Sequence, residues 1–136
     1  MQSHELWLKI VQEDLKAAEG LLAIELFSAV TFHCQQAAEK SLKGYLAFKN
    51  QPIIKTHDLI KLVELCMKID VDFRSIYEEA KLLNPFSTKF RYPTEYDIPD
   101  FVDAESAIKQ TQKIVRFVIK KISKLETEQT TIFKPI

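Results

Sequence analysis

Apolar residues recur at three- and four-residue steps along most of the chain, which is the spacing of one buried face of an α-helix. The pattern predicts helices over residues 3–23, 27–48, 57–69, 73–83 and 100–125. Asn50, Gln51 and Pro52 end the second helix, because proline cannot continue a helix. Only a short link joins the first two helices, so we expect them to pack antiparallel as a hairpin.

Two breaks between the predicted helices carry polar side chains. Thr56 is the predicted N-cap of the third helix, because its hydroxyl can accept a hydrogen bond from a free amide of the first turn. Asp58 suits the positive helix end, and His57 is interpreted as a first-turn residue whose ring completes the helix start. Residues 85–99 contain three prolines and show no helical period, which predicts a loop. Loops of this length in a small bundle are often functional.

The composition favours an all-α fold. Of the 136 residues, 46% are apolar and only two are glycine, whereas the turns of a sheet demand more glycine. The length suits one domain with its own core. We therefore predict an up-and-down antiparallel helical bundle of about four to five helices over residues 3–126, followed by a tail at residues 127–136.

Charge and cysteine content exclude several classes of function. Nineteen basic and 19 acidic residues cancel, so any anion site must be local. Cys34 and Cys66 have apolar neighbours and no metal-type spacing, which predicts reduced core thiols and, with no histidine at ligand spacing, neither metal nor cofactor. No apolar run approaches the roughly 20 residues that cross a bilayer, and the start lacks a signal-type segment. We expect a cytoplasmic protein with no membrane partner.

The second predicted helix carries polar residues along one edge of its apolar face. Gln35, Glu39 and Lys43 follow one another at four-residue steps and form one row, and Gln36 and Lys40 form the neighbouring row. Two interpretations stay open. The rows are either a solvated face with helix-stabilising ion pairs, or a surface that meets a second helix or a phosphate.

The predicted loop places a permanent cation, Arg91, between aromatic residues, and Pro93 restricts Tyr92 to extended backbone. A guanidinium held in this way can bind a phosphate through two hydrogen bonds or stack on a base. Alternatively, Arg91 pairs with a helix carboxylate such as Glu39 or Asp14 and fixes the loop.

Three segments, in this order, resemble motifs of the HEPN family, the higher eukaryote and prokaryote nucleotide-binding domain. They are FHCQQAAEKSLKGYL at 32–46, KTHDL at 55–59 and FRYP at 90–93, and the resemblance covers about residues 5–125. It implies an up-and-down helical bundle with an additional short helix, commonly a homodimer, similar to the C-terminal helical domain of kanamycin-type nucleotidyltransferases.

Many HEPN proteins are metal-independent ribonucleases in which a histidine follows the loop arginine by a few positions. Such an arginine stabilises crowded phosphate charge while the histidine moves protons. This chain departs from the pattern, because residues 92–98 contain no histidine, and Arg91 carries over only as the loop arginine. Other small HEPN chains are paired with a minimal nucleotidyltransferase in two-component systems.

The sequence leaves three hypotheses for the function. In the leading one, a non-catalytic HEPN homodimer binds a minimal nucleotidyltransferase in a toxin-antitoxin-like system, with a nucleotide or RNA phosphate as a further ligand. In the second, the protein is a ribonuclease toxin that uses Arg91 with an unconventional proton carrier such as His57, Tyr92 or Tyr96. In the third, it is a structural helical dimer without ligand. The candidate phosphate-binding or partner-facing residues are Gln35, Glu39, Lys40, Lys43, His57, Arg91 and Tyr92.

Overall fold

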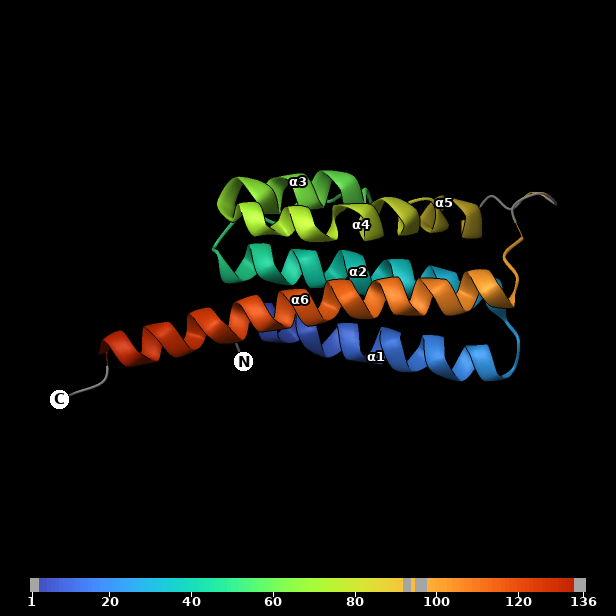
Figure 1. The fold of residues 1–136 in the computed structure, drawn as a ribbon, viewed down its shortest axis with the longest axis horizontal. Helices are drawn as coiled ribbons and strands as arrows, with labels where there is room; N and C mark the ends of the chain where they lie inside the picture. Colours follow the sequence, from blue (N-terminus) through green and yellow to red (C-terminus); the bar gives the residue numbers. More distant parts are fainter. Residues whose placement is uncertain (1–2, 92–93, 95–97, 134–136) are drawn as a thin grey trace.

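The fold is that of a computed structural model, which describes residues 3–91, 94 and 98–133 (Figure 1). The side chains of residues 90, 91 and 129–133 lie outside the description. The helices are α1 (Ser3–Ala23), α2 (Phe27–Phe48), α3 (Leu59–Ile69), the 3-10 helix η1 (Val71–Ile76), α4 (Tyr77–Leu83), α5 (Phe86–Arg91) and α6 (Phe101–Phe133). The predicted all-α helical bundle is confirmed.

Helix α2 is the centre of the bundle and packs against α1, α3, α5 and α6. Helices α1 and α2 form the predicted antiparallel hairpin, and α6 lies along them (Figure 1). Helix α2 carries Gly44 where it contacts α1, and a Cβ atom at Gly44 would lie 3.1 Å from Cβ of Trp7. The small residue therefore permits this close contact.

The apolar faces of all the longer helices meet in one main core. The buried rings of Tyr45 and Phe73 contact each other in this core at 4.4 Å between centroids, and the partly buried Phe117 packs edge to face on Phe73 at 4.9 Å. Cys34 and Cys66 are buried free thiols, as predicted. Burial disfavours their thiolate forms and raises the pKa of each to about 12, so both act as apolar core residues.

The predicted N-cap of the third helix was wrong by two residues. Asp58 is the N-cap of α3, and its side chain accepts hydrogen bonds from the amides of Ile60 and Lys61. Thr56 accepts only from the Asp58 amide, at 3.2 Å. Asn84, at the end of α4, accepts from the Leu59 amide at 2.7 Å and donates to Asp58 at 3.2 Å. A contact distant in sequence thus helps to fix the cap at Asp58.

The predicted loop at 85–99 begins with a helix, α5, which covers Phe86–Arg91. Pro85 does not prevent it, because a proline just before the first helical turn lacks only an amide that would have no partner there. Its carbonyl accepts from the Lys89 amide at 3.0 Å. Helix α6 also continues to Phe133, well beyond the predicted end at residue 125. The helix can continue because there is no glycine or proline between Pro99 and Pro135.

The C-terminal part of α6 extends beyond the ends of the other helices (Figure 1). Within the described residues, no helix combines the length and the apolar character needed to cross a bilayer.

The contact at Gly44 gives a stability prediction. Gly44→Val places a branched side chain against Trp7, whose Cβ is attached directly to the α1 backbone and cannot swing away. We expect the free energy of unfolding, measured by urea denaturation, to fall by about 1–3 kcal/mol.

The matched control is Gly20→Ala in α1, where a new Cβ meets no atom within 4 Å. It should raise the free energy of unfolding by about 0.5–1 kcal/mol, because alanine favours the helix. A Gly44→Val protein as stable as the parent would contradict the close packing of α1 and α2.

Candidate functional site

The polar edge of α2 is an interior feature. Gln35 has no exposed surface and Glu39 is 3% exposed. They are buried because α2 is covered on several sides by other helices. The interpretation as a solvated face was therefore wrong for these two residues.

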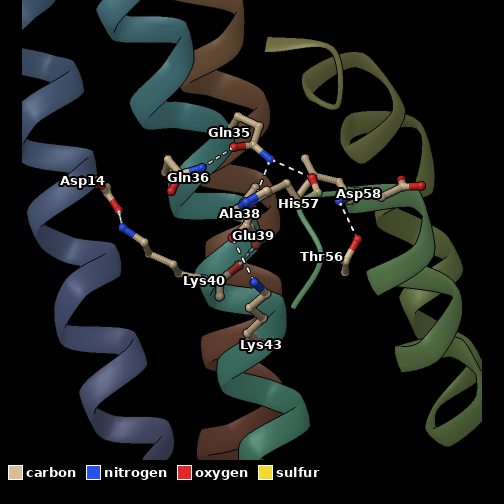
Figure 2. A network of polar contacts seen from close by, with 12 residues as sticks. Asp14, Gln35, Gln36, Ala38, Glu39, Lys40, Lys43, Thr56, His57 and Asp58 are labelled. Carbon is tan, nitrogen blue, oxygen red and sulfur yellow. Dashed lines mark hydrogen bonds and ion pairs between the residues drawn. The ribbon is translucent and has the colours of Figure 1, made fainter. Parts of the chain in front are cut away.

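Glu39 is the hub of a polar network (Figure 2). Its Oε2 accepts from Nζ of Lys43 at 3.0 Å, and its Oε1 lies 2.9 Å from Nδ1 of His57. Nε2 of Gln35 donates to the same Oε1 at 3.3 Å and to the His57 carbonyl at 3.0 Å. Both carboxylate oxygens therefore have partners, which offsets the cost of burying the charge.

The network fixes the segment before α3 onto α2. His57 contributes its ring to Glu39 and its carbonyl to Gln35, so it does not complete the start of α3 as predicted. Its side chain is still 53% exposed, whereas that of Lys43 is only 12% exposed. Solvent reaches the network mainly on the His57 side.

The neighbouring row of α2 faces α1. Nζ of Lys40 donates to Oδ2 of Asp14 at 2.8 Å, and Oδ1 of Asp14 lies 2.9 Å from Nδ1 of His33. Gln36 instead donates to Oε1 of Gln35 at 2.7 Å, which joins the two rows. Asp14 is 8% exposed, so α1 and α2 share a second buried carboxylate.

Sequence reasoning did not assign these roles to Asp14 and His33. The sequence does indicate that Asp14 is buried, because it lies at helical spacing between Val11 and Ala18 on the apolar stripe of α1. A charged residue on such a stripe needs an opposite charge on the facing helix. The basic residue at the same height of α2 is Lys40.

The network limits what Lys40 and Lys43 can do chemically. Each ammonium group already binds a carboxylate, which offsets its charge and leaves less of it for a phosphate. Among the residues that the structure describes, no three histidine, cysteine or acidic side chains form a group that could hold a metal ion.

Arg91 is the last residue of α5, and α5 packs against α2. The chain therefore brings the third motif to the helix that carries the first. The Arg91 side chain, Tyr92 and Tyr96 lie outside the described residues, so their roles stay predictions. Glu39 and Asp14, the alternative partners of Arg91, both bind basic side chains from α2.

The three motifs occur in this order along an all-α bundle. The family model described as the HEPN domain matches residues 4–122. The chain belongs to the HEPN family. The comparison with curated proteins gives no match.

Two solved structures resemble this HEPN chain. The crystal structure of TT1696 from Thermus thermophilus has a TM-score of 0.79 and 30% identity, covering 89% of this chain and 99% of that one. The crystal structure of ST0689, an archaeal HEPN homologue, has a TM-score of 0.71 and 26% identity, covering 90% and 99%.

In this HEPN protein, the first two motifs act together. Gln35, Glu39 and Lys43 come from the second helix, and His57 comes from the KTHDL segment. Hydrogen bonds thus connect the two motifs, although Gln35 and His57 lie 22 residues apart in sequence. Gln35 and Glu39 are buried, and their contacts join the partly exposed His57 to α2.

The Glu39 network gives a second stability prediction. Glu39→Gln keeps the shape of the side chain but removes the charge that Lys43 and His57 share. We expect the free energy of unfolding to fall by about 1–3 kcal/mol, because a buried cation loses its partner. Urea denaturation at neutral pH measures the change.

Glu105→Gln is the matched control, since Glu105 pairs with Lys109 on the surface at 3.7 Å. Its effect should stay within about 0.5 kcal/mol. Equal effects of the two substitutions would show that the Glu39 pairs contribute no more than surface pairs.

Proposed function

We propose that this HEPN protein is a non-catalytic binding subunit that pairs with a minimal nucleotidyltransferase in a toxin-antitoxin-like two-component system. The proposal rests on one observation: the charged side chains along the polar edge of α2 form ion pairs within the protein. Glu39 binds Lys43 and His57, and Asp14 binds Lys40 and His33.

This arrangement suits binding better than catalysis. A ribonuclease needs a side chain that exchanges protons with the attacking hydroxyl and the leaving oxygen. In HEPN ribonucleases a histidine shortly after the loop arginine does so, and residues 92–98 contain none. His57 is the most exposed member of the network, but its Nδ1 is held by Glu39.

An apolar surface at one end of the bundle supports a protein partner. The end patch consists of Leu26, Phe27, Ile98 and Phe101, of which Leu26 is 51% and Ile98 is 66% exposed. Phe27 and Phe101 meet edge to face at 6.1 Å, and an open hollow of about 380 Å³ lies over Leu26, Phe27 and Ile98. Exposed apolar surface of this kind is typical of interaction sites.

We assign the end patch to the nucleotidyltransferase, because two of its residues, Ile98 and Phe101, follow the third HEPN motif closely in sequence. Homodimer formation belongs to the same proposal and would use another face.

The proposal predicts that a minimal nucleotidyltransferase is encoded beside the gene of this protein, and co-expression of the two chains tests their pairing. We expect the two chains to elute together in size-exclusion chromatography. Leu26→Asp with Ile98→Asp should prevent co-elution, because it places charge on the end patch. Ile53→Asp is the matched control, since Ile53 is 75% exposed and outside the patch.

Separate elution of the two parent chains would overturn the partner assignment. Cleavage of tRNA or mRNA by the purified protein, lost in Arg91→Ala, would overturn the non-catalytic assignment and favour the ribonuclease hypothesis.

A further inference from the structure

Helix α6 concentrates positive charge in a protein that is neutral overall. Between Glu105 and Glu126 the chain has six basic residues and no acidic one. They are Lys109, Lys113, Arg116, Lys120, Lys121 and Lys124. The rest of the chain carries the compensating excess of acidic residues. Some of these bind α6 directly, because Glu79 pairs with Lys113 and both Asp70 and Asp72 pair with Lys121.

Five of these residues form a basic stripe on one face of α6, made of Lys109, Lys113, Arg116, Lys120 and Lys124. They follow one another at three- and four-residue steps, which places them in one row. All five are exposed, whereas Ile114, Val118 and Ile122 on the other side of the helix are buried in the core.

The C-terminal part of the stripe is not neutralised. Lys109 lies 3.7 Å from Glu105, and Lys113 binds Glu79. Arg116, Lys120 and Lys124 make no ion pair with any residue in the described ranges. Like charges at these spacings repel one another, which slightly destabilises the helix when no anion is bound. The same row of positive charge attracts an anion to this face.

Phe117 lies beside the stripe and forms an apolar wall. One open hollow of about 490 Å³ is lined by Phe117, Val71, Asp72, Arg74 and Ser75. Another of about 200 Å³ is lined by Phe117, Lys120, Lys121 and Lys124. The Phe117 ring is held in place by the edge-to-face contact with Phe73 at 4.9 Å.

Lys121 also fixes this wall. Its ammonium lies 5.7 Å from the Phe117 ring centroid and binds Asp70 at 2.8 Å and Asp72 at 2.6 Å. Lys121 is therefore a structural residue, and the cations that remain for a ligand are Arg116, Lys120 and Lys124, with Arg74 across the hollow.

We propose that the basic stripe and Phe117 bind the phosphate backbone of a single-stranded nucleic acid, without cleaving it. A row of cations beside an aromatic wall is the arrangement that binds such strands without reading their sequence. An acidic protein is a weaker match, because lysine is depleted at protein–protein interfaces and four of the five stripe residues are lysine.

The dimensions agree with a nucleic-acid strand. From Arg116 to Lys124 the helix rises by about 12 Å. One strand in duplex geometry carries about three to four phosphates over that length, and an extended strand carries fewer. Each of the available cations therefore has a phosphate within reach. This surface is separate from the end patch, so the proposal does not depend on the nucleotidyltransferase.

Fluorescence anisotropy of labelled oligonucleotides tests the proposal with the purified full chain. The probes are an RNA and a DNA strand of the same mixed sequence, and the duplex of that DNA. Backbone binding predicts similar affinity for the two single strands and weaker binding of the duplex, whose bases cannot reach Phe117.

The decisive variant is Arg116→Glu with Lys120→Glu and Lys124→Glu. We expect it to weaken binding at least tenfold. The slope of log affinity against log salt should also become less steep by about 2, because each of the three lost phosphate contacts contributes about 0.7 to it. Lys9→Glu with Lys16→Glu and Lys61→Glu is the matched control, because these exposed lysines lie on α1 and α3 and give the same net charge.

The control should bind within twofold of the parent, and circular dichroism melts should show that both variants fold. Equal weakening in the two triple variants would overturn the proposal, because net charge alone would then explain binding. No binding of either single strand by the parent, or tighter binding of the duplex, would also overturn it. So would binding of polyglutamate to the stripe without binding of the strands, which would assign the surface to an acidic protein.

Discussion

The structure depends on the neutralisation of one buried carboxylate, that of Glu39 on the central helix. A charge taken out of water destabilises the fold unless it is paired and hydrogen-bonded. Lys43 supplies a cation from the next turn, and His57 and Gln35 supply the remaining contacts. Because His57 directly precedes the Asp58 cap, these contacts hold the start of α3 against α2.

The same physical solution recurs on the other side of α2. Asp14 of α1 is neutralised by Lys40 and contacted by His33, so each of the two polar rows connects α2 to a different neighbour. The HEPN bundle is thus held by specific ion pairs in addition to apolar packing, and such pairs define the register of helices that could otherwise slide. Because these charges are used internally, we assign ligand binding to two other surfaces, the end patch and the exposed face of α6.

The sequence predicted the long helices well, because their apolar faces repeat at helical spacing. It failed where a distant residue decides the local structure. Asn84 supports the cap at Asp58, and nothing near Thr56 indicates this contact. The polar row was recognised, but whether Glu39 faced water or another segment depended on His57, 18 residues away. The α5 helix was missed because the prolines around it outweighed its own short sequence.

A double-mutant cycle between Glu39 and His57 tests the central claim most directly. The free energy of unfolding is measured for the parent, Glu39→Gln, His57→Gln and the double variant. If the pair connects α2 to the segment before α3, the two changes should be non-additive by about 1 kcal/mol, even though His57 is partly exposed. Additivity within about 0.3 kcal/mol would mean that the two residues are not energetically coupled. The first two HEPN motifs would then not hold the bundle together through this pair, which would contradict the central claim.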